Sequence, residues 1–273
     1  MDKYLISVDL DDTLLTQDKN ITEESIRYIQ ELERKGHHFI INTGRLHQGA
    51  IEYLKKLSIR EPMIVNNGGA IVYYDESYDK VVDYITFEMD MDKVISFNKK
   101  IKHMLHCGTV TSVFKFYTYD LEKTPFWVIH KSKDVEIIEG DISKTLNSKP
   151  HMSEYYVKKE FEKEFEEVLN QEEYKDFHVT KWGTFDDVIS YEISSLSADK
   201  AKAMIYLANK FNIPLKNTIS FGDQLNDLPM IECANYGVAM INSRVEVKEK
   251  AKYISEFDFN HDGVINFIKK IIQ

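Results

Sequence analysis

Short apolar runs alternate with helical patterns along the N-terminal part of the chain, and this alternation constrains the fold more than any other feature. The run YLISVDL at residues 4–10 has the apolar, β-branched character of a buried strand that ends in acid. A helical pattern follows at residues 21–36, and the apolar runs HHFIINTG and PMIVNNGG flank a second helical pattern that ends near Leu57. Strand, helix and strand in this order are typical of a parallel sheet. We therefore expect an α/β fold.

The alternation is interrupted in the middle of the chain. Residues 83–186 are rich in aromatic side chains and mix strand-like runs with helical patterns, one of them over residues 92–106. After this block, strands and helices alternate again. We expect an α/β core formed by residues 1–82 and 187–273, with an inserted α+β domain over residues 83–186.

The composition excludes several classes of function. The net charge is −10, with 45 acidic against 35 basic residues, which argues against a nucleic-acid backbone as the main partner. No stretch of about 18 apolar residues is present, so we expect no membrane span, and the first residues lack the apolar run of a signal peptide. The two cysteines, Cys107 and Cys233, form no CxxC pair, which favours two buried thiols in a reducing cytoplasm. We expect a cytoplasmic protein with no nucleic-acid and no membrane partner.

Four apolar runs end in clusters of polar residues. The clusters are Asp9 with Asp11 and Asp12, Thr43 with Gly44 and Arg45, Asn66 with Asn67 and Gly68, and Gly222 with Asp223. In an open parallel sheet, ligands bind beyond the carboxyl ends of the strands, so the four clusters would converge on one crevice. This convergence is the strongest functional signal among the residues themselves.

The aspartates of the first cluster need a positive partner. Asp9 and Asp11 lie two residues apart, so in an extended backbone their side chains point the same way, while Asp12 points away. Carboxylates that close repel one another, and a divalent cation shared with Asp223 would relieve the repulsion. Mg²⁺ suits a site of few carboxylates, water and substrate phosphate.

A phosphate at this edge of the sheet would need a cation and hydrogen-bond donors. Thr43, Lys200 and Asn226 can supply them. One carboxylate could attack phosphorus while its neighbour moves a proton. The residues therefore favour phosphoryl transfer.

Four ordered motifs resemble those of the haloacid dehalogenase (HAD) superfamily of phosphohydrolases. They read DLDDTLL, NTGR, SADKAKAM and GDQLNDLPM, and the runs NNGGA and YGVAMINS resemble the Cof-type branch. The match covers both core segments, about two thirds of the chain. The resemblance implies a HAD-like core, a Rossmann-like doubly wound parallel sheet, with an inserted cap that sets substrate specificity.

The resemblance also implies a catalytic role for the carboxylates. Asp9 corresponds to the nucleophile that forms an aspartyl-phosphate, and Asp11 to the general acid and base. Negative neighbours should raise the pKa of Asp11. Asp223 corresponds to a ligand of Mg²⁺, together with the Asp9 carboxylate and the Asp11 backbone carbonyl. Asp227 lies beside the metal, as a direct ligand or as support for the ligands.

The remaining matched residues correspond to the phosphate site. Thr43 and Lys200 would bind the transferring phosphoryl group, Asn226 would lie near it, and Gly44 would let the backbone approach it. Arg45 and His47 could face the substrate or lie on the surface, and the sequence favours neither.

We predict a Mg²⁺-dependent phosphatase that hydrolyses small phosphorylated metabolites, sugar phosphates first. Two alternatives stay open: a phosphomutase of the same superfamily, and a catalytically inactive regulator that binds a phosphorylated metabolite. The sequence specifies neither the individual substrate nor the oligomeric state.

Overall fold

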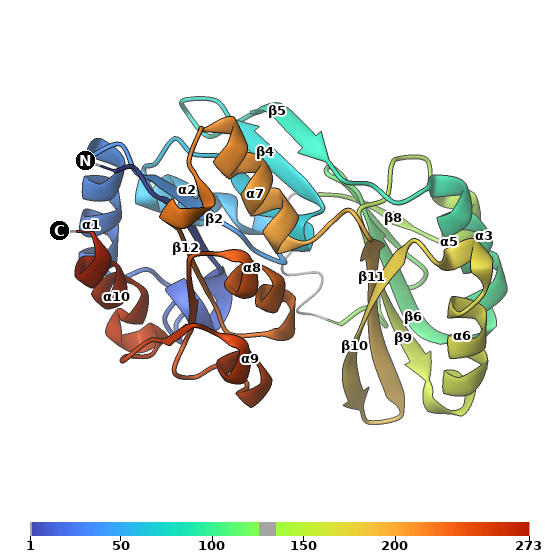
Figure 1. The fold of residues 1–273 in the computed structure, drawn as a ribbon. Helices are drawn as coiled ribbons and strands as arrows, with labels where there is room; N and C mark the ends of the chain where they lie inside the picture. The colour runs from blue at the N-terminus through green and yellow to red at the C-terminus, as the bar shows by residue number, and fades with distance from the viewer. Residues whose placement is uncertain (1, 126–134, 273) are drawn as a thin grey trace. The chain divides into compact units, whose positions relative to one another are not determined.

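The computed structural model describes residues 2–125 and 135–272, which form two compact units (Figure 1). Unit 1 consists of Met1–Ile85 and Asp199–Gln273, and unit 2 consists of Thr86–Ala198. Each unit has a sheet and buried apolar side chains of its own. Unit 2 is thus inserted into the chain of unit 1.

Unit 1 is built on a five-stranded sheet that is parallel throughout. Its order is β14 (Tyr253–Ile254), β13 (Tyr236–Ala239), β12 (Thr218–Gly222), β1 (Leu5–Val8) and β2 (His38–Ile41). A small sheet of β3 (Met63–Val65), β4 (Ala70–Tyr74) and β5 (Val81–Thr86) lies beyond β2, joined to it by a parallel bridge between Asn42 and Ile64. All four residues of β1 are buried, as expected for a strand covered on both faces.

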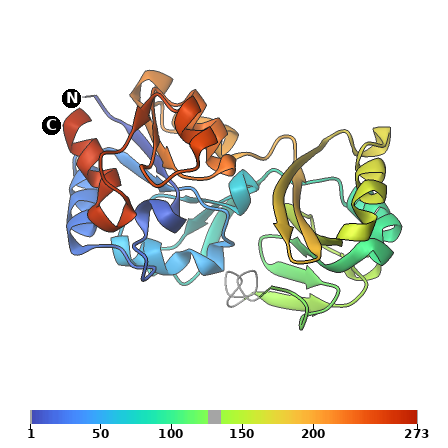
Figure 2. The same ribbon diagram turned by 90° about the horizontal axis from the view of Figure 1, so that it is seen from below.

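Helices cover both faces of this sheet, so the expected doubly wound parallel sheet is confirmed (Figures 1 and 2). The helices are α1 (Glu23–Arg34), α2 (Ile51–Leu57), α7 (Lys200–Lys210), α8 (Leu228–Cys233), α9 (Val245–Lys250) and α10 (Gly263–Ile271). The helices α1 and α10 lie side by side, where the Tyr28 hydroxyl donates to the Ile272 carbonyl oxygen at 3.3 Å. On the other face, α7 packs against α8.

Unit 2 is a six-stranded sheet with helices on one face. Its order is β10 (Phe177–Phe185), β11 (Val188–Ser195), β9 (Met152–Lys158), β6 (Leu105–Thr111), β7 (Lys115–Thr118) and β8 (Glu136–Glu139). The helices are α3 (Met91–Ile101), α5 (Ile142–Thr145) and α6 (Glu162–Leu169). Phe97 of α3 makes edge-to-face contacts with Tyr155, Phe165 and Tyr174, with ring centroids 4.9–5.6 Å apart. Such aromatic pairs add to the stabilisation from their burial.

The structure differs from the sequence prediction around the inserted unit. The predicted return to the core at residue 187 comes at Asp199, because β11 pairs with β9 and β10 in the sheet of unit 2. The helix predicted over residues 92–106 ends at Ile101, and the chain continues as β6. The apolar run at residues 125–131 is predicted to be a strand and includes Trp127. Residues 126–131 of this run lie outside the described residues.

Candidate active site

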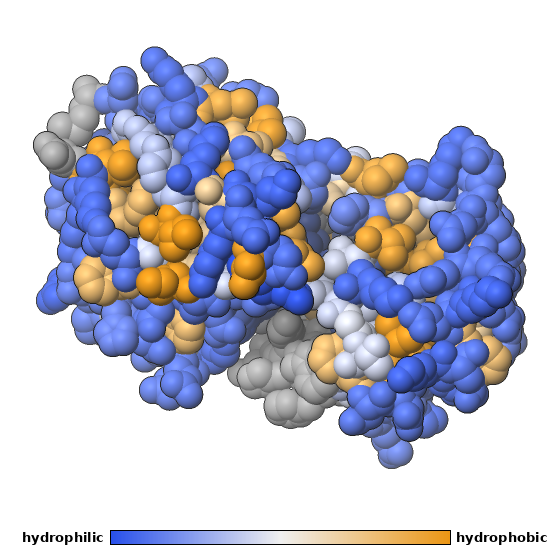
Figure 3. All heavy atoms as spheres, turned by 60° about the horizontal axis from the view of Figure 1, so that its bottom comes forward, coloured by the Kyte–Doolittle hydropathy of each residue, from blue (hydrophilic) through white to orange (hydrophobic). Residues whose placement is uncertain are grey.

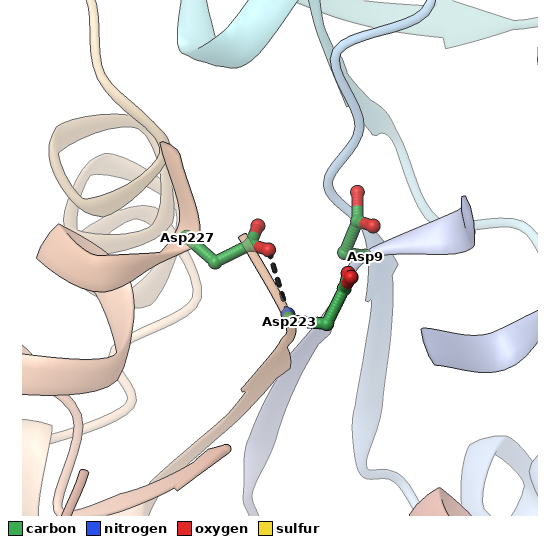
Figure 4. A group of neighbouring side chains, drawn as sticks. All are labelled: Asp9, Asp223 and Asp227. Carbon is green, nitrogen blue, oxygen red and sulfur yellow. Dashed lines mark hydrogen bonds between the residues drawn. The ribbon is translucent and has the colours of Figure 1, made fainter. Parts of the chain in front are cut away.

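Three aspartate side chains converge at the carboxyl end of the parallel sheet. Asp9 directly follows β1 and Asp223 directly follows the neighbouring β12, so they leave adjacent strands at the same edge. Asp227 ends the short turn Leu225–Asp227. Carboxylate oxygens of the three buried residues lie within 4.8 Å of one another. Figure 4 shows the carboxylates of Asp9 and Asp223 close together, with Asp227 approaching from the turn.

Lys200 brings a positive charge into this group of carboxylates. It is the first residue of α7, and its side chain is fully buried. Its Nζ donates to Asp9 Oδ1 at 2.7 Å and to Asp227 Oδ1 at 2.6 Å. A buried ammonium group is costly unless partners compensate for lost water. Lys200, Asp9 and Asp227 therefore form one buried ion cluster.

The position of Lys200 depends on how α7 begins. The Asp199 carboxylate caps the helix by accepting from the Lys202 backbone N–H at 2.7 Å. Gly68, in the turn after β3, has φ +90°, and a Cβ there would lie 2.2 Å from the Asp199 carbonyl oxygen. Only glycine combines this backbone conformation with this close approach. The glycine turn after β3 thus supports the residue that carries the lysine.

The carboxylates of the site are short of positive charge. Burial raises the pKa of Asp9 above its ordinary value, Lys200 opposes the shift, and Asp227 and Asp223 add to it. Burial and the charge of Asp227 raise the pKa of Asp223 to about 7. Burial would lower the pKa of Lys200, but the carboxylates of Asp227 and Asp9 outweigh burial and raise it. One lysine does not neutralise three carboxylates.

Asp227 uses both of its carboxylate oxygens within the protein. Oδ1 accepts from Lys200, and Oδ2 accepts from the backbone N–H groups of Asp223 and Gln224 at 2.9 and 3.0 Å. A Cβ on Gly222 would lie 2.3 Å from Asp227 Cγ, so glycine makes room for this arrangement. These contacts favour Asp227 as the support of the loop and of Lys200 over direct contact with a metal.

Asp9 and Asp223 fit a hard divalent cation. Both offer carboxylate oxygens, the ligand type that Mg²⁺ prefers, and both carboxyl groups have raised pKa values that a nearby cation would lower. The Asp223 carboxylate is held in place by the Thr13 hydroxyl at 3.2 Å and by Gln224 Nε2 at 2.7 Å. The contact of Asp11 with the metal was predicted for its backbone carbonyl, so that prediction does not depend on the Asp11 side chain.

The Asp11 side chain has different partners from those of Asp9. Its oxygens accept from Arg45 Nε at 2.8 Å and Arg45 Nη2 at 2.7 Å, and Lys19 Nζ lies 3.0 Å from Oδ1. The expectation that Asp9 and Asp11 project together from an extended strand is wrong, because the chain turns through Leu10–Leu14 directly after Asp9. Asp12, with φ 55°, is half exposed, in line with the expectation that its side chain points away.

The expected rise in the pKa of Asp11 is also corrected. Burial alone would raise this pKa, but the hydrogen bonds and charge of Arg45, together with Lys19, hold it well below its usual range. In the local sequence, the only charged residues within two positions of Asp11 are the acids Asp9 and Asp12. The two bases lie 8 and 34 residues further along the chain, and only the fold brings them to Asp11.

Arg45 and His47, for which the sequence favoured neither a substrate contact nor a surface position, are both buried. Arg45 forms the two-pronged ion pair with Asp11, and His47 Nδ1 is hydrogen-bonded to the Tyr74 hydroxyl at 2.5 Å. A signal for Arg45 was present in the sequence. Arg45 directly follows Thr43 and Gly44 in a polar cluster that was predicted to converge with the cluster of Asp11.

Of the predicted phosphate-binding residues, Lys200 begins α7, and Thr43, Gly44 and Asn226 lie on turns of unit 1. The buried Thr43 hydroxyl accepts from the Arg45 backbone N–H at 3.2 Å. A Cβ on Gly44 would lie 2.7 Å from Asn67 Oδ1, and the same oxygen accepts from Asn226 Nδ2 at 2.8 Å. The sequence pointed to Asn67 only as one member of a polar cluster. In the structure, Asn67 links the turn of Gly44 to the turn of Asn226.

Comparison with known proteins identifies the family. A family model described as haloacid dehalogenase-like hydrolase matches residues 6–268. The chain belongs to this family. The resemblance inferred from the four motifs, including the Cof-type branch, is confirmed.

Relatives and solved structures of similar proteins agree with this membership. The chain is 28% identical over 269 residues to the 5-amino-6-(5-phospho-D-ribitylamino)uracil phosphatase YitU of Bacillus subtilis, covering 98% of this chain and 97% of that protein. It is 24% identical to the phosphatase YwpJ of Bacillus subtilis, covering 98% and 99%. The fold is similar to that of a haloacid dehalogenase-like hydrolase from Bacteroides thetaiotaomicron, with a TM-score of 0.78, 21% identity and coverage of 99% and 100%.

These findings make the chain a HAD-superfamily enzyme that hydrolyses phosphoric monoesters, as predicted.

Within residues 2–125 and 135–272, no helix has the length and apolar character needed to cross a membrane. The face shown in Figure 3 is mostly hydrophilic, with apolar residues in separate patches.

Proposed function

We propose that this enzyme is a Mg²⁺-dependent phosphatase that acts through an aspartyl-phosphate on Asp9. The observation that carries the proposal is the buried cluster in which Lys200 joins Asp9 to Asp227, with Asp223 beside it. Asp9 lies next to the fixed positive charge of Lys200 and next to Asp223, a proposed ligand for a metal cation. A carboxylate in this position is suited to attack an anionic phosphoryl group.

In the first step, an Asp9 carboxylate oxygen attacks phosphorus and the bond from phosphorus to the ester oxygen breaks. The ester oxygen takes a proton from Asp11 and leaves as an alcohol. Lys200 stabilises the charge near the nucleophile, and Thr43, Gly44 and Asn226 hold the phosphoryl oxygens.

In the second step, water attacks the phosphorus of the aspartyl-phosphate. Asp11 takes a proton from this water, the bond from phosphorus to Asp9 breaks, and phosphate leaves with the Asp9 carboxylate restored. Asp223, Asp9 and the Asp11 carbonyl would hold Mg²⁺, which would supply positive charge to the transferring group. Asp227 keeps Lys200 and the Asp223 loop in place.

The substrate class that we propose is small phosphorylated metabolites, with sugar and polyol phosphates first. The phosphorylated ribityl compound in the name of the Bacillus subtilis relative supports this class. We propose that unit 2, residues 83–186 in the sequence prediction and Thr86–Ala198 in the structure, acts as the cap that selects the substrate. A cytoplasmic location is supported by the two free cysteines.

The test is an Asp9→Asn variant assayed with 4-nitrophenyl phosphate and with a panel of sugar and polyol phosphates. The wild type should release phosphate with Mg²⁺ and lose the activity with EDTA, and Asp9→Asn should be inactive under both conditions. Asp12→Asn is the matched control, because Asp12 lies in the same motif but is half exposed. Substantial turnover by Asp9→Asn would refute the proposed nucleophile.

The same panel separates the alternatives. A phosphomutase would convert a sugar phosphate into its isomer and retain the phosphate. A binding regulator would bind a sugar phosphate without turnover even when Mg²⁺ is present.

A further inference from the structure

We propose that Arg45 exchanges partners during the reaction, giving up the Asp11 carboxylate as it binds the phosphoryl oxygens of the substrate. This inference rests on the proposed function, because it explains how the proposed acid becomes available. Three features of the structure carry it: the geometry of the ion pair, the fixed position of the guanidinium group, and the freedom of Asp11 to move.

The ion pair occupies both oxygens of Asp11. Arg45 Nε donates to Oδ2 at 2.8 Å and Nη2 donates to Oδ1 at 2.7 Å, the forked geometry in which Arg binds a carboxylate most strongly. A general acid needs one carboxyl oxygen that carries a hydrogen and can turn toward the leaving oxygen. While Arg45 holds both oxygens in this fork, the carboxyl group cannot turn toward the leaving oxygen, so the pair has to open before Asp11 donates a proton.

Arg45 is fixed on its other side. Its Nη1 donates to the Gly49 carbonyl oxygen at 3.0 Å and to the Tyr53 hydroxyl at 3.3 Å, and the guanidinium carbon lies 5.2 Å from the centre of the Tyr53 ring. Its backbone N–H donates to the Thr43 hydroxyl. The whole residue is only 8% exposed. Movement of the guanidinium group would break its contacts with Gly49 and Tyr53.

Asp11 is held less firmly. Its side chain is 31% exposed, and its remaining partner is Lys19, whose side chain is 47% exposed. The backbone torsions of Asp11 and Asp12 in the turn Leu10–Leu14 are not helical, so no helix face fixes the direction of the Asp11 side chain. The pair therefore opens by movement of Asp11 away from a stationary Arg45.

Opening leaves a buried guanidinium group that needs another anion. An unpaired buried charge is strongly unfavourable, so Asp11 leaves only when a second anion takes its place. A phosphoryl group offers the same two-pronged set of acceptor oxygens as a carboxylate. Thr43, the proposed phosphoryl ligand, lies two residues from Arg45 and is hydrogen-bonded to it. Binding of the substrate and release of the acid are thereby coupled.

The test compares wild type, Arg45→Gln, Arg45→Lys and the control Lys19→Gln. The kcat and KM are measured with 4-nitrophenyl phosphate and with glycerol 1-phosphate, and the Kd of inorganic phosphate is measured by calorimetry with Mg²⁺ present. Arg45→Gln should raise both KM values and the Kd together by about tenfold or more, with kcat changed by less than about threefold. Arg45→Lys should lie in between, because it keeps the charge and loses the fork. Lys19→Gln should change KM by less than about twofold.

Two results would overturn the inference. One is an Arg45→Gln variant with unchanged KM and phosphate Kd whose kcat collapses with glycerol 1-phosphate alone. That result would make Arg45 a fixed support of Asp11. The other is a normal Kd for phosphate in an Arg45→Gln protein that melts like the wild type. If the wild type itself lacks turnover, the proposed function fails, and the phosphate Kd values still decide the role of Arg45.

Discussion

At the scale of single residues, the balance of charge around Lys200 governs the candidate site. The lysine is enclosed by two carboxylates within 2.7 Å, with a third beside them, and its side chain has no exposure to water. Replacing a whole buried ion pair by apolar groups is often tolerated, whereas removing one partner leaves the other charge uncompensated. The cluster should therefore respond strongly to any change that removes its cation.

Lys200→Met tests this expectation. The change should lower the free energy of unfolding by about 3–5 kcal/mol, because Asp9 and Asp227 lose their buried partner. It should also lower kcat by a factor of at least about 10². Lys202→Met, two residues further along α7, is the control, because its side chain is 51% exposed and its pair with Asp199 contributes at most about 1 kcal/mol. Urea unfolding and phosphate release check both values, and equal effects of the two variants would contradict the account.

A second residue, His151 of unit 2, should make stability depend on pH. It is 2% exposed, and neither ring nitrogen has a hydrogen-bond partner among the described residues. Burial, with a contribution from Lys149, lowers its pKa from 6.5 to about 4. As the pH falls, the unfolded chain therefore binds a proton before the folded protein does. The contribution of His151 to the stability of the folded state is complete above pH 6.5 and is lost as the pH falls from 6.5 toward 4.

The loss should amount to about 2 kcal/mol between pH 7 and pH 5. Urea unfolding of the wild type and of His151→Leu at the two pH values measures it. The variant should lack this part of the pH dependence, and the same slope in both proteins would show that His151 does not cause it.

At the scale of elements, the turn after β3 determines where α7 begins. Gly68→Ala would place a methyl group 2.2 Å from the Asp199 carbonyl oxygen, at a φ of +90°. Gly140→Ala is the matched control, since Gly140 has φ +134° but a Cβ there would lie at an ordinary contact distance, 3.5 Å, from Thr145 Cγ2. Gly68→Ala should cost about 1–2 kcal/mol more than Gly140→Ala and lower kcat through a displaced Lys200. Thermal unfolding and kcat decide this, and equal costs with an unchanged kcat would contradict it.

Most elements of unit 1 could be predicted from the sequence, because alternating apolar and amphipathic patterns report burial directly. The convergence of Asp9 and Asp223 followed from their places at the ends of parallel strands. The polar cluster that contains Arg45 was predicted to converge with the cluster of Asp11, but the ion pair itself could not be predicted, since it depends on how two turns meet across 34 residues. The boundary near Asp199 was missed because β11 has the same apolar character whether it pairs in unit 1 or unit 2.

At the scale of the whole molecule, two cores imply two folding units. The aromatic core around Phe97 and the buried strands of the parallel sheet belong to different units. A unit with a core of its own is expected to fold alone. Residues 86–198 expressed by themselves should unfold cooperatively on heating and have no phosphatase activity. A gradual loss of structure without a transition would contradict this expectation.

The central claim is that the phosphoryl group passes through Asp9, and rapid quenching tests it most directly. Wild-type enzyme is mixed with an active substrate and Mg²⁺, quenched in acid within one turnover, digested and mapped by mass spectrometry. The account predicts a phosphoryl group on the peptide that contains Asp9, absent from Asp9→Asn and present in Asp12→Asn. Turnover by the wild type with no phosphoryl group on that peptide at any quench time would contradict it.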